Sequence, residues 1–379
     1  MKINCLILLI LQIIFCKSTF AETAAIPAPP KIDASAYLIM DFDSGQLLAS
    51  ENIDQRIPPA SLTKMMTIYV AASELAENKI HLDDKVVVSE KAWRMLGSRM
   101  FIEVNKEVTV GDLLKGIIIQ SGNDASVALA EYISGDEDVF AELMNQHASR
   151  LGLTNSHFTD SSGLPNEQHY TTAYDMAILA AALIRDFPDI YALHSEREFT
   201  YNGITQQNRN SLLWLDKTVD GIKTGHTEEA GYCLVTSAKR DDMRLISVVM
   251  GSKGEKARTE TSLALLNYGF RFYETRKLFS ANEILTTAKI WKGDTDSVRL
   301  GLTGDLYITI PRGQFENINT VFDLPERMIA PIAQGDEKGK VKLILSDKEI
   351  VSRPLFAMQS IAQGGLFSRL KDDIRMILQ

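Results

Sequence analysis

The chain has 379 residues, of which 45% are hydrophobic and 23% are charged, and its formal net charge is -9 at pH 7. This ordinary globular composition and this length favour two domains rather than one. The negative charge argues against a nucleic-acid partner, because a protein that binds phosphate backbones needs a basic face. It excludes no small anionic substrate, since a local cationic pocket can still bind one.

The N-terminal segment, residues 1–21, has the composition of a secretory signal peptide. Lys2 precedes an apolar run from Ile3 to Phe15, and small residues follow up to Ala21. The apolar run is too short to span a bilayer comfortably, so we predict export with cleavage after Ala21 rather than a retained anchor. Bulky residues before Cys16 disfavour a lipoprotein anchor there.

The segment after the signal peptide begins with a linker and a hairpin. Residues 22–32 are rich in Ala and Pro and predict a linker. The apolar runs 36–40 and 46–49 flank the turn Asp43-Ser44-Gly45 and predict a β-hairpin. Apolar periodicity then predicts helices over 61–75, 110–119, 125–132, 139–151 and 173–184.

Strands return near residue 231. The runs 232–238 and 245–250 flank a polar turn and predict a second hairpin, which a helix over 259–273 follows. A domain that opens and closes with hairpins fits an antiparallel sheet built from both ends, with a helical insert. We therefore predict an α+β domain over 33–280. Cys233, alone once the signal peptide with Cys5 and Cys16 is removed, is interpreted as a small buried hydrophobe rather than a nucleophile.

The remainder of the chain changes character twice. Short alternating runs at 285–291, 298–302, 306–310 and 341–345 predict a small all-β domain over 281–355, for support or partner contact. The tail, 356–379, ends in a predicted amphipathic helix with apolar residues on one face and charged residues on the other. Such a helix can lie in a membrane surface or dock onto its own domain, and its weakly basic polar face leaves both open.

Three short motifs occur in order along the first domain. They are Ser61-Leu62-Thr63-Lys64, Ser121-Gly122-Asn123 and Lys223-Thr224-Gly225. Taken singly, the first two are weak signals, because Ser-x-x-Lys recurs at Ser368 and Ser-x-Asn recurs at Ser50. Their order and their surroundings therefore carry more information than any one of them.

Ser61 follows an extended Pro-Pro-Ala segment and opens a helix, so the side chain of Lys64 shares its helical face. A hydroxyl needs a base to become a nucleophile, and lysine can act as that base only when it is neutral. Burial and a second cation, for which Lys223 is the candidate, would both lower the pKa of Lys64. The alternative is that Ser61 only caps a helix and Lys64 is a solvated residue of the first turn.

The other two motifs offer polar groups to a substrate. Ser121 lies between two predicted helices and could relay a proton, while Asn123 could orient a lysine or a substrate carbonyl. Asp124 is interpreted as the cap of the following helix. Gly225 would let a substrate backbone approach a strand edge, and Lys223 with Thr224 offers donors to a carboxylate.

This set resembles the active-site serine penicillin-binding proteins and β-lactamases, and more closely the low-molecular-mass D-alanyl-D-alanine carboxypeptidases. The surroundings at 58–64, 121–125, 151–164 and 220–227 are similar to that family, and so is the layout of the chain. The resemblance implies a β-lactamase/transpeptidase-like catalytic domain with no cofactor and no metal. It also implies covalent inhibition by β-lactams, attachment of the tail to the membrane surface, and a place at the periplasmic face of the inner membrane.

The resemblance also implies a role for each motif residue. Ser61 would attack the bond between the two terminal D-alanines of a peptidoglycan stem pentapeptide, and water would hydrolyse the acyl-enzyme. Lys64 would take and return the proton, assisted by Ser121 and Lys223. The substrate would be held by Asn123, by Thr224 and Gly225 at its carboxylate, and by the N–H groups of Ser61 and His226 at its oxyanion. Arg258 matches a carboxylate-binding arginine, and its alternative is a surface arginine that begins the last helix.

Four alternatives to a carboxypeptidase are considered. A β-lactamase needs a deacylating glutamate, and Glu167 is the candidate, although the flanking sequence and the extra β domain fit poorly. An endopeptidase that cuts wall cross-links would use the same residues. A non-catalytic wall-binding protein would have no need of both motif lysines. A metal hydrolase is disfavoured because no two histidines have ligand spacing.

Overall fold

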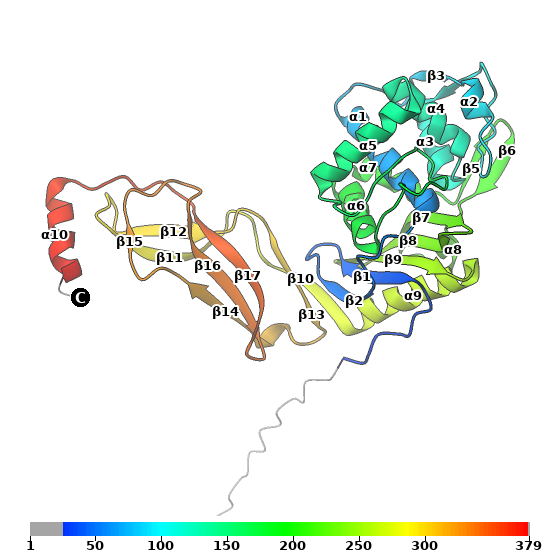
Figure 1. The fold of residues 1–379 in the computed structure, drawn as a ribbon. Helices are drawn as coiled ribbons and strands as arrows, with labels where there is room; N and C mark the ends of the chain where they lie inside the picture. Colours follow the sequence, from blue (N-terminus) through cyan, green and yellow to red (C-terminus); the bar gives the residue numbers. More distant parts are fainter. Residues whose placement is uncertain (1–25, 378–379) are drawn as a thin grey trace, which may run out of the picture.

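The computed structural model describes residues 26–377 (Figure 1). The predicted signal peptide, with Cys5 and Cys16, and the last two residues of the chain lie outside the described residues. A mixed helix-and-sheet domain carries a narrower β domain, and helix α10 (Leu366–Ile377) lies at the far end of that β domain (Figure 1).

The first domain is built on a five-stranded antiparallel sheet. In chain order its strands are β1 (Ala36–Asp41), β2 (Leu47–Glu51), β7 (Val219–Thr227), β8 (Gly231–Arg240) and β9 (Met243–Ser252). They are arranged β2-β1-β9-β8-β7, so the first and last parts of the domain meet where β1 pairs with β9. Both predicted hairpins are present, and the predicted antiparallel sheet with a helical insert is confirmed. Strand β7, which carries the third motif and forms one edge of the sheet, was missed by the sequence analysis.

Helices cover both faces of this sheet. The insert contains α1 (Lys64–Ala76), α3 (Val110–Ile119), α4 (Asn123–Ser134), α5 (Glu137–Leu151) and α6 (Ala173–Asp186). The helix predicted to begin at residue 61 begins as a short 3₁₀ turn, η1 (Ala60–Thr63), and becomes α-helical at residue 64. Helix α9 (Glu255–Phe272) lies on the opposite face of the sheet (Figure 1).

Side chains along β1 alternate between the two faces of the sheet, which explains why helices cover both faces. Leu38 and Met40 belong to the apolar cluster under the helical insert, whereas Tyr37 and Ile39 belong to the cluster under α9. Successive side chains of a strand point to opposite faces, so a strand that is apolar on every residue needs a layer on each side.

Several short elements complete the first domain, and the sequence analysis predicted none of them. They are β3 (Lys85–Val87), α2 (Glu90–Trp93), β4 (Glu107–Thr109), α7 (Pro188–Ala192), η2 (Leu193–Ser195), β5 (Glu198–Tyr201), β6 (Ile204–Gln207) and α8 (Leu212–Leu215).

The β domain contains eight strands. They are β10 (Tyr273–Phe279), β11 (Ile284–Trp291), β12 (Ser297–Gly301), β13 (Leu306–Pro311), β14 (Ile318–Asp323), β15 (Met328–Ile329), β16 (Glu337–Leu345) and β17 (Lys348–Ala357). Another 3₁₀ turn, η3 (Phe315–Asn317), precedes β14. The strands β10 and β13 pair with each other, and the other six form one sheet around a separate apolar cluster.

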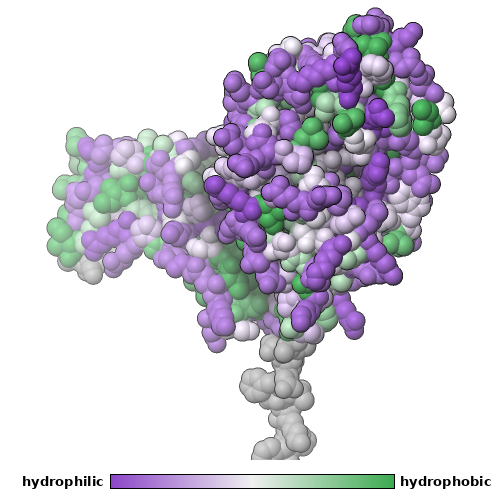
Figure 2. All heavy atoms as spheres, turned by 45° about the vertical axis from the view of Figure 1, so that its right-hand side comes forward, coloured by the Kyte–Doolittle hydropathy of each residue, from purple (hydrophilic) through white to green (hydrophobic). Residues whose placement is uncertain are grey.

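Polar contacts join the two domains. The hydroxyl of Thr275 on β10 donates to the carboxylate of Asp41 over 2.6 Å, and the hydroxyls of Ser44 and Thr309 lie 2.6 Å apart. The β domain therefore contacts the first domain at the end of β1 and at the β1–β2 turn, away from the edge strand β7. In Figure 2 hydrophobic side chains lie at the end of the β domain that carries α10, whereas most of the first domain's visible surface is hydrophilic.

Candidate active site

The three motifs meet in one cleft of the first domain. Ser61 lies in η1, Ser121 and Asn123 lie where α3 gives way to α4, and Lys223 lies on β7. The cleft has a volume of about 220 Å³ and is lined by Ser61, Ser98, Ser121, Arg209, Thr224, Gly225, His226, Tyr232, Glu255 and Arg258. Elements that are far apart in the sequence thus place hydroxyl, ammonium and guanidinium groups around one small space.

The side chain of Lys64 lies beside Ser61, and its Nζ has three hydrogen-bond acceptors. Its Nζ lies 3.1 Å from Ser61 Oγ, 2.7 Å from Asn123 Oδ1 and 2.6 Å from the carbonyl oxygen of Ser162. An ammonium has three protons, so these acceptors can satisfy all of them. The side chain of Lys64 is 0% exposed. The alternative of a solvated first-turn lysine is therefore wrong.

Burial changes the acid–base chemistry of this lysine. Removal of the ammonium from water lowers the pKa of Lys64 to about 7, although the carboxylates of Asp160, Asp124 and Glu137 act in the opposite direction. A lysine with a pKa near 7 is neutral in a large fraction of molecules at neutral pH. Lys64 can therefore accept the proton of a hydroxyl 3.1 Å away.

A second buried lysine contacts the second motif. Lys223 Nζ lies 2.8 Å from Ser121 Oγ and 3.0 Å from the carbonyl oxygen of Thr224. Burial lowers the pKa of Lys223 well below its usual value, and the positive charges of Lys64, Arg209 and Arg258 lower it further. From the sequence, Lys223 was predicted to lower the pKa of Lys64. In the structure burial is the main cause of the lowered pKa of both lysines, and the positive charge of Lys64 lowers the pKa of Lys223 further.

Ser121 has an unusual backbone conformation. Its φ is +63°, in the left-handed region that non-glycine residues rarely adopt. The turn places Ser121 Oγ against the lysine of β7 and leaves the following residues free to begin α4. Backbone strain of this kind persists only where the surrounding structure holds it, which here includes the Lys223 contact.

Asn123 and Asp124 anchor the other wall of the cleft. Asn123 accepts from Lys64 and donates through Nδ2 to the carbonyl oxygen of Leu96 over 2.6 Å. Asp124 is not the N-cap that the sequence analysis predicted, because Gly122 occupies that position. Its carboxylate instead accepts from the backbone N–H groups of Met100 and Phe101, each over 2.8 Å, and so holds the loop that precedes β4.

Gly225 and Arg258 lie on the opposite side. A Cβ on Gly225 would lie 3.0 Å from the carbonyl oxygen of Pro59, so glycine at this position lets β7 approach η1. The predicted reason, approach of a substrate, is thus not the only one. Arg258 is buried, with its guanidinium 3.3 Å from the carbonyl oxygen of Gly225 and 3.1 Å from Glu255 Oε1, so the surface alternative is wrong. His226 is exposed, and its ring lies tilted against that of Tyr232 at a centroid distance of 4.0 Å.

Comparison with known proteins identifies the family. A sequence model described as D-alanyl-D-alanine carboxypeptidase matches residues 23–254, and one described as penicillin-binding protein 5, C-terminal domain, matches residues 273–363. The chain belongs to the D-alanyl-D-alanine carboxypeptidase family. The D-alanyl-D-alanine carboxypeptidase DacC of Escherichia coli K12 is 44% identical over 371 residues, which cover 96% of this chain and 92% of that protein.

Solved structures of carboxypeptidase relatives agree with this assignment. Penicillin-binding protein 5 from Haemophilus influenzae superposes with a TM-score of 0.88 at 45% identity, over 89% of this chain and 100% of that chain. Penicillin-binding protein D2 from Listeria monocytogenes, solved in its ampicillin-bound form, gives a TM-score of 0.60 at 28% identity, over 64% of this chain and 100% of that chain. The predicted family and the predicted fold class are confirmed.

Several residues of the carboxypeptidase cleft were not predicted. Ser98, Arg209, Tyr232 and Glu255 line the cleft, and they come from loops, from the start of β8 and from the start of α9, without a motif of their own. Glu167, the deacylating residue of the β-lactamase alternative, is exposed and does not line the cleft. Among residues 26–377 no group of His, Cys, Asp or Glu side chains is arranged to hold a metal ion.

Cys233 is buried in β8, as the sequence analysis expected. Burial raises the pKa of its thiol to about 11. The thiolate is the reactive form of cysteine, so this residue is not a nucleophile at neutral pH.

Proposed function

We propose that the D-alanyl-D-alanine carboxypeptidase reaction of this chain proceeds through an acyl-enzyme on Ser61, with Lys64 as the general base. The observation that carries the proposal is the placement of a fully buried lysine Nζ 3.1 Å from a partly exposed serine Oγ at the mouth of the cleft. Nucleophile and base within hydrogen-bond reach, with the base held by further groups, is the arrangement that acyl transfer requires.

In the acylation step Ser61 Oγ bonds to the carbonyl carbon of the penultimate D-alanine of a stem pentapeptide, and the C–N bond to the terminal D-alanine breaks. Lys64 takes the hydroxyl proton and gives it to the hydroxyl of Ser121, while Ser121 gives its own proton to the leaving nitrogen, so that both groups return to their starting states. Lys223 Nζ, 2.8 Å from Ser121 Oγ, holds this hydroxyl in place for the transfer. Water then attacks the ester, which releases the shortened peptide and restores Ser61.

The rest of the cleft suits a substrate that ends in a carboxylate. Arg258 brings positive charge to the side of the cleft formed by β7, and Thr224 adds a hydroxyl. The backbone N–H groups of Ser61 and His226 are the proposed oxyanion donors, because η1 packs against the edge strand β7. Asn123, held by Lys64 and Leu96, would contact the substrate amide.

β-Lactams would acylate the same serine, since penicillin-binding protein D2 of Listeria monocytogenes has been solved in its ampicillin-bound form. A strained lactam amide would open on Ser61 and leave no small product to diffuse away. The resulting ester would block the cleft until water reaches it. We therefore propose β-lactams as covalent inhibitors and the stem peptide as substrate.

We also propose that the chain is exported and that α10 attaches it to the membrane surface at the periplasmic face. The apolar side chains of Leu366, Phe367, Leu370, Ile374 and Ile377 on α10 are all exposed, Phe367 by 91%. An amphipathic helix with an uncovered apolar face can lie in the bilayer interface. In the part of the chain that the structure describes, no helix is both long enough and apolar enough to cross a membrane.

Intact-mass measurement of the mature protein with a penicillin tests the nucleophile. One penicilloyl group per chain is expected on the wild type and none on Ser61→Ala. Ser368→Ala is the matched control, because Ser368 belongs to the other Ser-x-x-Lys sequence of the chain and should keep the adduct. Release of D-alanine from a stem pentapeptide, measured on the same samples, tests the substrate. A wild-type protein without the adduct would overturn the assignment of Ser61.

A further inference from the structure

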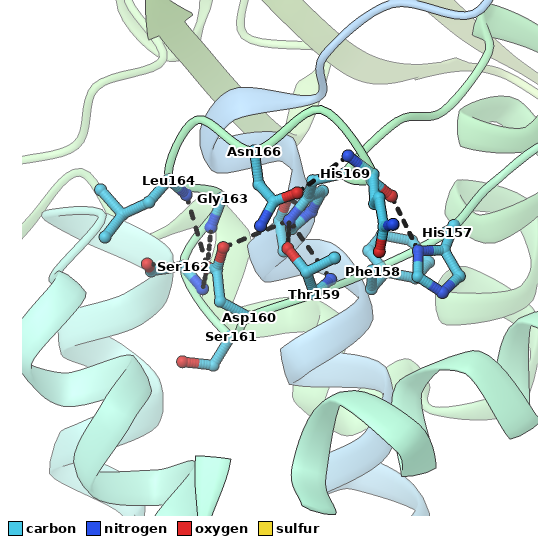
Figure 3. A network of polar contacts seen from close by, with 12 residues as sticks. His157, Phe158, Thr159, Asp160, Ser161, Ser162, Gly163, Leu164, Asn166 and His169 are labelled. Atoms are coloured by element: carbon cyan, nitrogen blue, oxygen red, sulfur yellow. Dashed lines mark hydrogen bonds and ion pairs between the residues drawn. The ribbon is translucent and has the colours of Figure 1, made fainter. Parts of the chain in front are cut away.

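Asp160 organises the loop that lies behind the nucleophile (Figure 3). Its Oδ1 accepts from the backbone N–H of Ser162 over 2.7 Å and from that of Gly163 over 2.6 Å. Burial alone would raise the pKa of Asp160, but these bonds and its contact with His169 lower the pKa to about 2. The carboxylate is therefore charged at neutral pH, and it fixes the turn whose Ser162 carbonyl oxygen accepts from Lys64.

His169 connects this loop to the turn that carries Ser61. Its Nδ1 lies 3.2 Å from Asp160 Oδ2, and its Nε2 lies 2.8 Å from the hydroxyl of Thr63. If Nδ1–H donates to the carboxylate, Nε2 of the neutral ring accepts from Thr63. Both His169 and Thr63 are buried, and Thr63 is the residue immediately before Lys64.

The loop also contacts the residue before the nucleophile. Gly163 has a φ of +86°, and a Cβ built on it would lie 1.8 Å from the carbonyl oxygen of Ala60. Backbone thus packs on backbone with no side chain between them. The loop cannot move without displacing Ala60 or the Ser162 carbonyl, and both neighbour the reacting pair.

We propose that Asp160 and His169 form a positioning pair, which fixes the Ser162 carbonyl on the Lys64 ammonium and thereby aims Nζ at Ser61 Oγ. Neither residue lines the cleft, so they act through Lys64 and Thr63 and touch no reacting atom. This inference rests on the proposed function, because it assigns a task to the base of that mechanism.

The negative charge of Asp160 allows a test that distinguishes this positioning role from a purely structural role in the loop. Lys64 faces Lys223 from β7, Asp124 from α4, Glu137 from α5 and Asp160 from the loop. After burial, which lowers the pKa of Lys64, Asp160 is the strongest of the carboxylates that raise it. Loss of this charge should let the pKa of Lys64 fall, so the base would remain neutral at a lower pH.

The experiment compares the pH dependence of acylation by a fluorescent penicillin for the wild type, Asp160→Asn and His169→Gln. Asp160→Asn keeps the shape and loses the charge. Its acylation should be at least about tenfold slower at the optimum pH. The acidic limb of its pH–rate profile should move to lower pH by about half a pH unit or more. His169→Gln keeps the carboxylate, so it should acylate more slowly without moving the limb.

Asp175→Asn is the matched control. Asp175 is another buried carboxylate near this loop, and it accepts from Asn155 N and Ser156 Oγ, away from Lys64. Its loss should lower the melting temperature and leave the acidic limb in place.

The outcomes distinguish this inference from the proposed function. The positioning pair would be overturned if the acidic limb of the pH–rate profile does not move in Asp160→Asn, or if Asp175→Asn moves it equally. In either case the wild type would still form its adduct. If Asp160→Asn does not fold, a wild-type acylation rate in His169→Gln would overturn the positioning pair as well. A wild-type protein that never acylates would instead overturn the proposed function.

Discussion

Lys64→Met tests whether the proposed base is held at the expense of folding stability. The substitution keeps the length and volume of the side chain and removes its charge. Burial lowers the pKa of Lys64 from 10.5 to about 7, and this difference corresponds to about 5 kcal/mol of lost stability at pH 6, at about 1.4 kcal/mol for each pKa unit. Methionine would remove that penalty.

The variant also leaves acceptors without a donor. Asn123 Oδ1 and the Ser162 carbonyl oxygen are buried and would each lose a hydrogen bond, at about 1–3 kcal/mol apiece. Ser61 is partly exposed, so water can replace the bond that it loses. The two effects oppose each other, and at pH 6 we expect Lys64→Met to be as stable as the wild type or more stable by a few kcal/mol.

The pH dependence gives the sharper signature, because unmade hydrogen bonds do not titrate. Between pH 7 and pH 10 the unfolded chain binds a proton at Lys64 that the native protein does not, so wild-type stability rises with pH relative to the variant. Below the folded pKa both states are protonated and the penalty is complete. The advantage of Lys64→Met should therefore shrink by about 4 kcal/mol from pH 7 to pH 10.

Urea unfolding of both proteins at each pH, followed by tryptophan fluorescence, measures this difference. Lys106→Met, which removes an exposed lysine, is the control and should show a flat difference. A flat difference for Lys64→Met over the same range would refute the depressed pKa. The variant should also form no penicilloyl adduct, because its side chain cannot accept the Ser61 proton.

Four further predictions concern the site, the core and the tail. Wild-type acylation should fall about tenfold for each pH unit below about 7, and a rate that is constant down to pH 5 would exclude Lys64 as base. Gly163→Ala should destabilise the protein by about 2–4 kcal/mol in urea unfolding and slow acylation, since its Cβ would overlap Ala60; Gly203→Ala, with φ +78° and open space around it, should leave acylation unchanged. Cys233 should not react with a maleimide at pH 8 in the native protein, whereas it should react in urea. Deletion of residues 364–379 should abolish binding to anionic vesicles and preserve D-alanine release in solution, and vesicle binding by the shortened chain would contradict the role given to α10.

Much of the fold could be predicted from periodicity and turns. The strands β8 and β9 are mostly apolar runs around a polar turn, and α3 was predicted with its observed bounds. Strand β7 was missed because Gly221, Lys223 and Gly225 interrupt the apolar pattern of Val219–Thr227. A strand at the cleft must carry polar and small residues, so its function removes the signal that would reveal it.

The candidate site, like the fold, could be predicted from the sequence only in part. Motif spacing was sufficient for Ser61 with Lys64, because three residues on a helical turn place two side chains together. It could not predict Asp160 and His169, since the histidine contacts a threonine 106 positions earlier in the chain. The prediction for Asp124 was wrong, because an acidic residue at a helix start suggests a cap, and only the tertiary structure shows that its carboxylate binds the backbone of Met100 and Phe101.

A buried base needs hydrogen-bond acceptors whose positions are fixed by residues outside the cleft. Lys64 is useful because burial lowers its pKa to about 7, but a buried ammonium without acceptors would be far more costly than this one. The acceptors are Asn123 and the Ser162 carbonyl, and the second of these is on a loop without regular structure. Such a carbonyl keeps its direction only if the loop is fixed. The Asp160 carboxylate and the contact of Gly163 with Ala60 hold this loop. The same low dielectric that lowers the pKa of Lys64 therefore gives the loop behind it a part in the proposed mechanism.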